Sequence, residues 1–324
     1  MKATIRTYKK PTKNKKPATI NASDIYEGIT ESIISLIEQG KKDGSKLWDN
    51  ANAVTAFRPT NAVTKLSYNV VNRLKLALTA TVMGYEENRW VTYNQAKIEG
   101  WQVRRGEKSI TLCYFNSYTK ENKETGEDEL LFFPKTFNVF NVSQLDGYVS
   151  VVDKNAPTVT TAENCEFITT IMAKTDVKFM PEMGDSAYYS PSHDMIQMPP
   201  KECFTSNNAY YSVMLHELTH STAHKSRLGR NEQYKNAYPT QIETYAREEL
   251  VAELGSAFLG AELGCLQANL EFHADYIDSW LSVLRSDKKA IFKACADAQK
   301  ATNYILENWV HEKAVVEEIE SLSA

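Results

Sequence analysis

The pentapeptide His216-Glu217-Leu218-Thr219-His220 constrains this 324-residue chain more than any other feature. On an α-helix, residues i and i+4 lie on one face, one turn apart. His216 and His220 could therefore direct two imidazoles at one ion, which suits tetrahedral zinc. The apolar residues 213–215 precede the motif and predict a partly buried helix, in which ionisable side chains need a reason to be present. We expect one Zn²⁺ per chain here; a chance match on a surface helix is the alternative.

The residues that would complete such a site lie on a second predicted helix. Glu217 would face the water on the ion, take its proton and later pass that proton to a leaving amine. Glu249, 29 residues after His220, is the expected third ligand. Glu253, one turn further, would hydrogen-bond a ligating histidine. Glu248 is the rival ligand, because the register of this helix is not set by the sequence.

Other side chains could join this chemistry. His273 could stabilise a developing oxyanion as a catalytic group, although a core or capping histidine is the plainer interpretation. Tyr188 and Tyr189, on a short predicted strand, could do the same. His224 would lie about 12 Å along the helix from His216, too far to share one ion.

Composition excludes several classes of protein. No run of apolar residues is long enough for a membrane span, and the chain starts without a secretory signal. The five cysteines contain no CxxC pair, so free thiols in a reducing cytoplasm are expected. Residues 1–150 carry a net charge of +6 and the remainder −10, while all six histidines follow residue 150. This asymmetry predicts an anionic partner for the first half.

The pattern of elements predicts an α+β chain in two domains. Residues 1–20 read as a flexible basic arm, 21–149 as a mixed domain, 150–162 as a linker and 163–324 as a mostly helical domain with a small sheet. Helices are expected near 25–40 and 70–83, and later near 163–174, 208–224, 240–264, 269–285 and 287–312. Strands are expected at 109–115, 130–133, 136–140, 187–189 and 195–198.

The first half also carries features of a single-stranded nucleic-acid binder, which combines cations along the backbone with aromatic stacking platforms. The candidate contacts are Arg73, Lys75, Trp90, Tyr93, Arg104, Arg105 and Lys108. The alternative is that the aromatic rings belong to the core and the cations solvate the surface.

Blocks spread along the chain resemble the ArdC antirestriction proteins, from about residue 24 to residue 310. In the second half these are 188–189, 194–199, 216–220, 227–228, 248–253, 274–281 and 287–292; in the first they are 59–62, 68–72, 90–96, 103–108 and 140–142. The chain departs from the family pattern at Val70, Ser221 and Ala223.

This resemblance implies a single-stranded-DNA-binding domain followed by a zincin-like metallopeptidase domain of the gluzincin type. It also implies protection of incoming plasmid or mobile-element DNA from host restriction. Related zincins place a second acid four residues after the ligand glutamate, a spacing that Glu249 and Glu253 fit.

Two rival functions remain open at the level of sequence. One is a DNA-shielding protein whose metal only stabilises the fold. The other is a processing protease that acts on a repressor or host protein, such as a restriction component. The motif alone does not decide whether the metal is catalytic.

Overall fold

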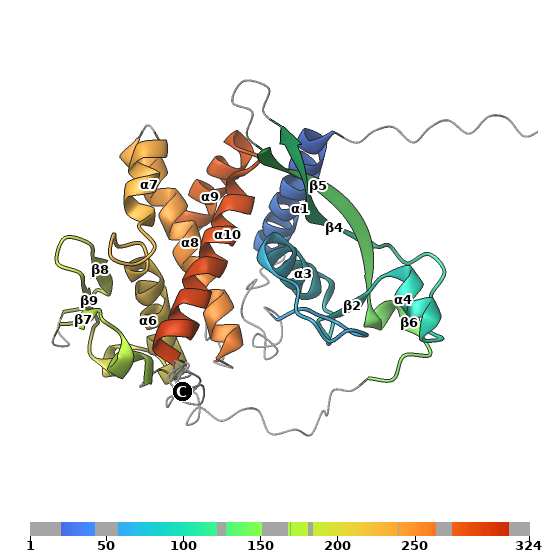
Figure 1. Cartoon of the computed structure of the whole chain (residues 1–324). Coiled ribbons are helices and arrows are strands. Elements are labelled where there is room, and N and C mark those ends of the chain that lie inside the picture. The colour runs from blue at the N-terminus through green and yellow to red at the C-terminus, as the bar shows by residue number, and fades with distance from the viewer. Residues whose placement is uncertain are drawn as a thin grey trace, which may run out of the picture.

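The computed structural model describes residues 21–42, 58–121, 128–150, 168, 170–180, 184–238, 240–263 and 274–310. It has the expected α+β architecture, with a helical body on one side and a curved sheet carrying two helices on the other (Figure 1). Residues 1–20, nearly all of the predicted linker and His273 lie outside the described residues. The predicted domain boundaries therefore stay predictions.

The first half is built from a sheet and two long helices. Helix α1 spans Ala22–Lys42 and α3 spans Val70–Met83, while the short α4 covers Tyr93–Ile98. The sheet has the order β1-β2-β5-β4, formed by Thr60–Asn61, Arg89–Val91, Asp128–Asn141 and Ile110–Glu121. A separate pair joins β3 (Gln102–Val103) to β6 (Leu145–Asp146), and a 3-10 turn, Val142–Gln144, precedes β6.

Helix α3 covers the open edge of β4. The Asn72 side chain donates to the Cys113 carbonyl at 2.6 Å and accepts from the Cys113 backbone N–H at 3.1 Å, as a neighbouring strand would. Lys75 donates from Nζ to the Thr111 carbonyl at 2.8 Å. Unpaired strand edges attract other strands, so α3 closes a surface that would otherwise promote aggregation.

The prediction of two strands at 130–133 and 136–140 is wrong, because β5 runs continuously through Pro134. Pro134 pairs in register with Phe115, two positions from the Cys113 pair. Since Cys113 points its backbone groups away from β5, the pair at Pro134 has the same outward orientation. The missing N–H of Pro134 therefore costs no bond between the two strands.

The second half consists of helices and a small sheet of order β7-β9-β8. The strands are Lys178–Phe179, Met195–Gln197 and Tyr188–Ser190. The helices are α6 (Asn207–Ser221), α7 (Arg230–Ala237), α8 (Gln241–Glu262), α9 (Ala274–Ser286) and α10 (Ala290–Ile305), with a 3-10 turn at Lys201–Cys203 and a π-turn at Leu306–Val310. Within the described helices, none is both long and apolar enough to cross a membrane.

Local sequence explains where the two central helices begin. The Ser206 side chain accepts from the Ala209 N–H at 3.1 Å and starts α6. Thr240 does the same for α8, accepting from the Glu243 N–H at 3.1 Å. Side-chain oxygens at these N-cap positions satisfy backbone donors that have no partner within the helix.

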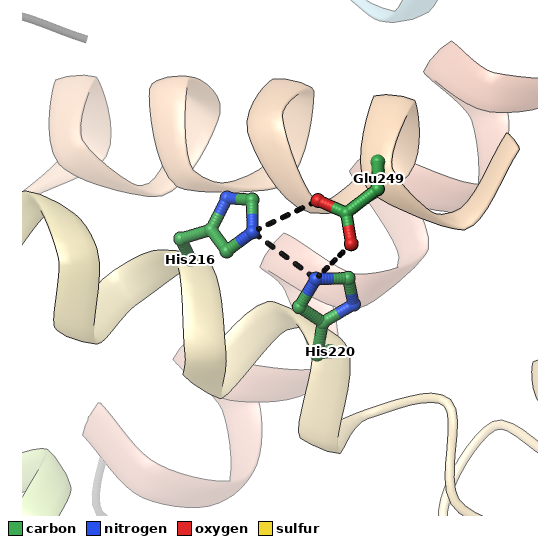
Figure 2. Close-up of side chains that lie close together, drawn as sticks. All are labelled: His216, His220 and Glu249. Carbon is green, nitrogen blue, oxygen red and sulfur yellow. Dashed lines mark hydrogen bonds and ion pairs between the residues drawn. The ribbon is translucent and has the colours of Figure 1, made fainter. Parts of the chain in front are cut away.

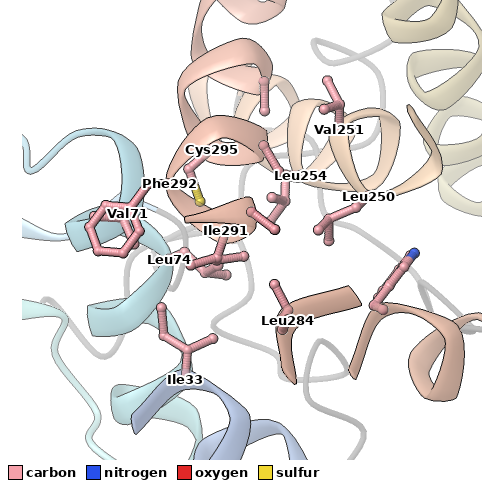
Figure 3. Close-up of a cluster of buried hydrophobic side chains, with 14 of the residues drawn as sticks. Ile33, Val71, Leu74, Leu250, Val251, Leu254, Leu284, Ile291, Phe292 and Cys295 are labelled. Carbon is pink, nitrogen blue, oxygen red and sulfur yellow. The ribbon is translucent and has the colours of Figure 1, made fainter. Parts of the chain in front are cut away.

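One hydrophobic core joins the two halves. Figure 3 shows Ile33 of α1 and Leu74 of α3 meeting Leu254 of α8 and Ile291 of α10, and all of these side chains are buried. Arg73 of α3 is 2% exposed and crosses the same boundary. It donates to the Phe258 carbonyl of α8 at 3.0 Å, pairs with Glu262 at 3.0 Å and lies over the Phe258 ring. The first half is therefore packed directly on the helix that carries Glu248 and Glu249.

Candidate metal centre

The two histidines of the motif lie on one face of α6, opposite a carboxylate of α8 (Figure 2). The Nε2 atoms of His216 and His220 are 3.1 Å apart. Each lies 3.5 Å from an oxygen of Glu249. Among the described residues, these are the ones grouped closely enough to share a metal ion.

The separations among these ligand atoms are similar to those around a zinc ion, with the two imidazoles facing different oxygens of Glu249, His216 facing Oε2 and His220 facing Oε1. Zinc–nitrogen and zinc–oxygen bonds of about 2.0–2.2 Å at tetrahedral angles hold neighbouring ligand atoms about 3.3–3.6 Å apart. The observed separations of 3.1 and 3.5 Å lie close to that range. Two imidazoles and one carboxylate are also a ligand set that zinc accepts.

Helix α8 supplies a carboxylate to the far side of each imidazole. Glu248 Oε1 lies 3.3 Å from Nδ1 of His220, and Glu253 Oε1 lies 3.6 Å from Nδ1 of His216. A proton on each Nδ1 leaves the Nε2 lone pairs directed at the shared centre. Glu248 thus contacts the ring of a candidate ligand, whereas Glu249 faces both Nε2 atoms.

The charges around the imidazoles favour a cation. Burial lowers the pKa of His216, but the charge of Glu253 and hydrogen bonds to Glu249 and Glu253 raise it well above its ordinary value. Burial likewise opposes protonation of His220, yet hydrogen bonds to Glu248 and Glu249 raise its pKa to about 9. Burial raises the pKa of Glu249, but both imidazoles outweigh it and hold that pKa well below its usual range. The pocket stabilises positive charge, which a divalent ion would supply in place of two protons.

The remaining candidates lie around this centre. Glu217 is buried on α6 beside His216, and its charge contributes to the raised pKa of that histidine. Tyr189 donates from its hydroxyl to Asp194 at 2.7 Å, while the Tyr188 ring is exposed on β8. His224 pairs with Ser226 at 2.7 Å and lies outside the cluster.

An arginine fastens the β8–β9 hairpin to the end of α6. Arg227 donates from Nε to the Ser221 carbonyl at 2.7 Å and from Nη1 to Asp194 at 3.1 Å. It also donates to the Tyr189 hydroxyl at 3.3 Å. This contact fixes the small sheet against the motif helix.

The structure divides the predicted DNA contacts into two groups. Arg73, Lys75 and Trp90 are buried, with exposed fractions of 2%, 6% and 0%. They pack inside the protein and offer no surface to a nucleic acid in this conformation. Tyr93, Arg104, Arg105 and Lys108 are exposed, although Arg104 also pairs with Glu107 at 3.0 Å.

Sequence reasoning missed the role of one cation in the metal centre. Arg230, the first residue of α7, donates two hydrogen bonds of 2.7 Å to the carboxylate of Glu248. The short α7 was not predicted, because its residues Arg230–Ala237 are mostly polar and show no apolar periodicity. The sequence carried no signal for an arginine that enters the core beneath the motif helix.

Comparison with known proteins finds a family match for each half of the chain. The N-terminal domain of anti-restriction factor ArdC matches residues 23–140, and a zincin-like metallopeptidase domain matches residues 166–297. The metal-free crystal structure of the antirestriction protein ArdC from the R388 plasmid is 35% identical, with a TM-score of 0.69 over 88% of this chain and 97% of that chain. Its Mn(II)-bound structure is 34% identical, with a TM-score of 0.68 over 89% and 99% of the two chains.

Proteins similar in sequence include the following two. The uncharacterized protein y4eC of Sinorhizobium fredii is 34% identical, over 89% of this chain and 92% of its own length. A DNA primase TraC of Escherichia coli is 35% identical over 87% of this chain, which spans only 27% of that longer protein. Similarity over nearly the full length of the R388 protein shows that this chain belongs to the ArdC family of antirestriction proteins, as its sequence blocks predicted.

Proposed function

We propose that this chain is a cytoplasmic antirestriction protein of a plasmid or other mobile element, which binds single-stranded DNA and holds one zinc ion in a metallopeptidase-type site. The observation that carries the proposal is the cluster of His216, His220 and Glu249, in which the two Nε2 atoms lie 3.1 Å apart and each lies 3.5 Å from a different oxygen of Glu249. The R388 relative is an antirestriction protein with a Mn(II)-bound structure, which supports a divalent ion at an equivalent site. Its plasmid origin supports a place on a mobile element, and we propose that the chain acts during conjugation.

The surrounding residues suit hydrolysis of a peptide bond. A bound zinc ion would supply a Lewis acid that lowers the pKa of a water molecule and polarises the substrate carbonyl. Glu217, next to His216, is the residue to accept the proton of that water and to return it to the leaving amine nitrogen. Glu248 and Glu253 lie beside Nδ1 of the two imidazoles, where each would accept a hydrogen bond and leave Nε2 free for the ion. Cleavage of a repressor or host restriction component would then complement the shielding of DNA, and His273 stays a proposed oxyanion stabiliser.

The DNA surface in this proposal is limited to exposed side chains. Tyr93 is 51% exposed, and Arg104, Arg105 and Lys108 also face solvent. Tyr114, 42% exposed on β4, lies opposite the exposed Lys135 of β5 and adds a ring and a cation on one face. Stacking on such rings contributes about 1–3 kcal/mol per base and does not depend on sequence.

Metal content is the first test. Purified wild-type protein is expected to contain one zinc per chain by elemental analysis, and His216→Ala and Glu249→Ala are expected to lose it. Wild-type protein that takes up no divalent ion, even when zinc is supplied, would refute the proposed site.

Glu217→Gln separates a catalytic metal from a structural one. The variant should keep the zinc but lose any cleavage-dependent antirestriction, measured as the survival of incoming plasmid DNA in a restricting host. Full antirestriction by Glu217→Gln would favour the DNA-shielding alternative.

The double variant Arg105→Ala with Lys108→Ala tests DNA binding better than deletion of residues 1–150 does. The deletion would remove α1 and α3, which share one hydrophobic core with α8 and α10.

A further inference from the structure

Arg230 is a buried cation beside the metal centre. It begins α7 directly after Gly229, whose φ of +63° turns the chain into the helix. The guanidinium is 3% exposed and donates to both oxygens of Glu248 at 2.7 Å. It also donates to the Thr219 carbonyl and the Thr222 hydroxyl of the α6 end, each at 3.2 Å.

These contacts close a ring through three helices. His220 of α6 lies 3.3 Å from Glu248 of α8. Glu248 is held by Arg230 of α7, which returns to α6 through the carbonyl of Thr219, the neighbour of His220. The position of the His220 ring is thereby tied to a planar, two-pronged contact, which only arginine can make.

Among the residues that the structure describes, no arginine holds the carboxylate beside His216 in the way that Arg230 holds Glu248. Glu253 Oε1 lies 3.6 Å from His216 Nδ1, and in the described part of the chain Glu253 Oε2 is buried without a hydrogen-bond partner. The centre is therefore asymmetric, with one ligand fixed by a ring of contacts and the other by a single longer one.

We infer that Arg230 is a positioning residue of the metal centre, which acts through Glu248 to hold His220 in the orientation that binds the ion. The inference rests on the proposed metal site. It opposes the plain electrostatic expectation, because a nearby cation repels a metal ion and its removal would by charge alone tighten binding. Partners that orient a ligand typically contribute 10–100-fold to metal affinity.

The test uses the full-length protein with zinc and with Co²⁺. Zinc affinity is measured by competition with a chelator, and ligand geometry by the visible absorption of the Co²⁺ form. Arg230→Met is expected to weaken zinc binding about 10–100-fold and to change the Co²⁺ spectrum. Arg230→Lys keeps the positive charge but cannot make the two-pronged guanidinium contact with Glu248. This variant should therefore fold, bind zinc more weakly than the wild type and show a changed Co²⁺ spectrum.

Arg73→Met is the matched control, since Arg73 is also a buried arginine that pairs with a carboxylate of α8, but its partner Glu262 lies away from the candidate ligands and their neighbours. It should lower thermal stability and leave the Co²⁺ spectrum unchanged. Wild-type affinity and spectrum in Arg230→Lys, or tighter binding in Arg230→Met, would overturn the positioning role. Absence of metal from the wild-type protein would instead count against the proposed function.

Discussion

Gly255 allows α8 to approach the motif helix closely enough to deliver Glu249. A Cβ built on Gly255 would lie 2.4 Å from Cγ2 and 3.0 Å from Oγ1 of Thr219, the residue next to His220. Ordinary contact begins at about 3.4 Å, so alanine at this position must move α6 or Thr219 by about 1 Å. Thr219 is 1% exposed and donates to the Leu215 carbonyl at 2.8 Å, so rotation of its side chain would break that bond.

Two opposing effects set the size of the change in Gly255→Ala. Alanine gains about 1 kcal/mol of helix propensity over glycine. Overpacking a filled core costs about 1–3 kcal/mol, and the lost hydrogen bond costs about 1 kcal/mol more. We expect Gly255→Ala to destabilise the fold by about 1–3 kcal/mol in urea unfolding and to weaken zinc binding, because α8 moves away from His216 and His220.

A second variant tests the cause. Thr219→Ala removes the two nearest atoms and leaves only Cβ, 3.3 Å from the added methyl. In the Thr219→Ala background, Gly255→Ala should therefore stabilise the protein by up to about 1 kcal/mol, which reverses the sign of its effect. Stabilisation by Gly255→Ala in the wild-type background would refute the close approach of the two helices.

Three further predictions concern the first half and its joint with the second. Burial lowers the pKa of Lys75 from 10.5 to about 8, so between these pH values the unfolded chain binds the extra proton and stability rises with pH. The stability of Lys75→Met relative to wild type should therefore fall by up to about 3 kcal/mol between pH 7 and pH 10.5 in urea unfolding; a constant difference would contradict the lowered pKa. Arg73→Met should destabilise the protein by about 1–3 kcal/mol while circular dichroism and metal release still report one transition, whereas two separate transitions would mean that the halves unfold independently. Arg105→Ala with Lys108→Ala should reduce the slope of log affinity for single-stranded DNA against log salt concentration by about 1.4, measured by fluorescence anisotropy, and an unchanged slope would remove both residues from the DNA surface.

Much of the candidate site was predictable because its information is local. The i, i+4 spacing of His216 and His220 places both rings on one helix face whatever the rest of the chain does. The helix that carries Glu249 was equally visible from its composition, and the sequence blocks identified the family. The prediction of α3 at residues 70–83 is confirmed for the same reason, since its apolar run ends at a glycine in the left-handed conformation.

Predictions that depended on which face of an element is buried were less successful. Arg73, Lys75 and Trp90 look like DNA contacts in sequence, because cations and aromatic rings are typical of such surfaces. The structure buries all three. Arg73, for example, pairs with Glu262 and donates to the Phe258 carbonyl, which lies 185 residues away in the chain. No local sequence pattern can identify a contact partner so far away in the chain.

The sequence by itself determined the motif, its helix, the placement of two imidazoles on one helix face and the family to which the chain belongs. Only the tertiary structure decided which of Glu248 and Glu249 faces the two Nε2 atoms, because adjacent residues on α8 point in directions about 100° apart and the packing of α8 on α6 turns Glu249 towards them. It also brought Arg230 into contact with Glu248 and placed Thr219 against Gly255. These outcomes rest on contacts between helices that are distant in sequence, and their energies exist only once the core has formed.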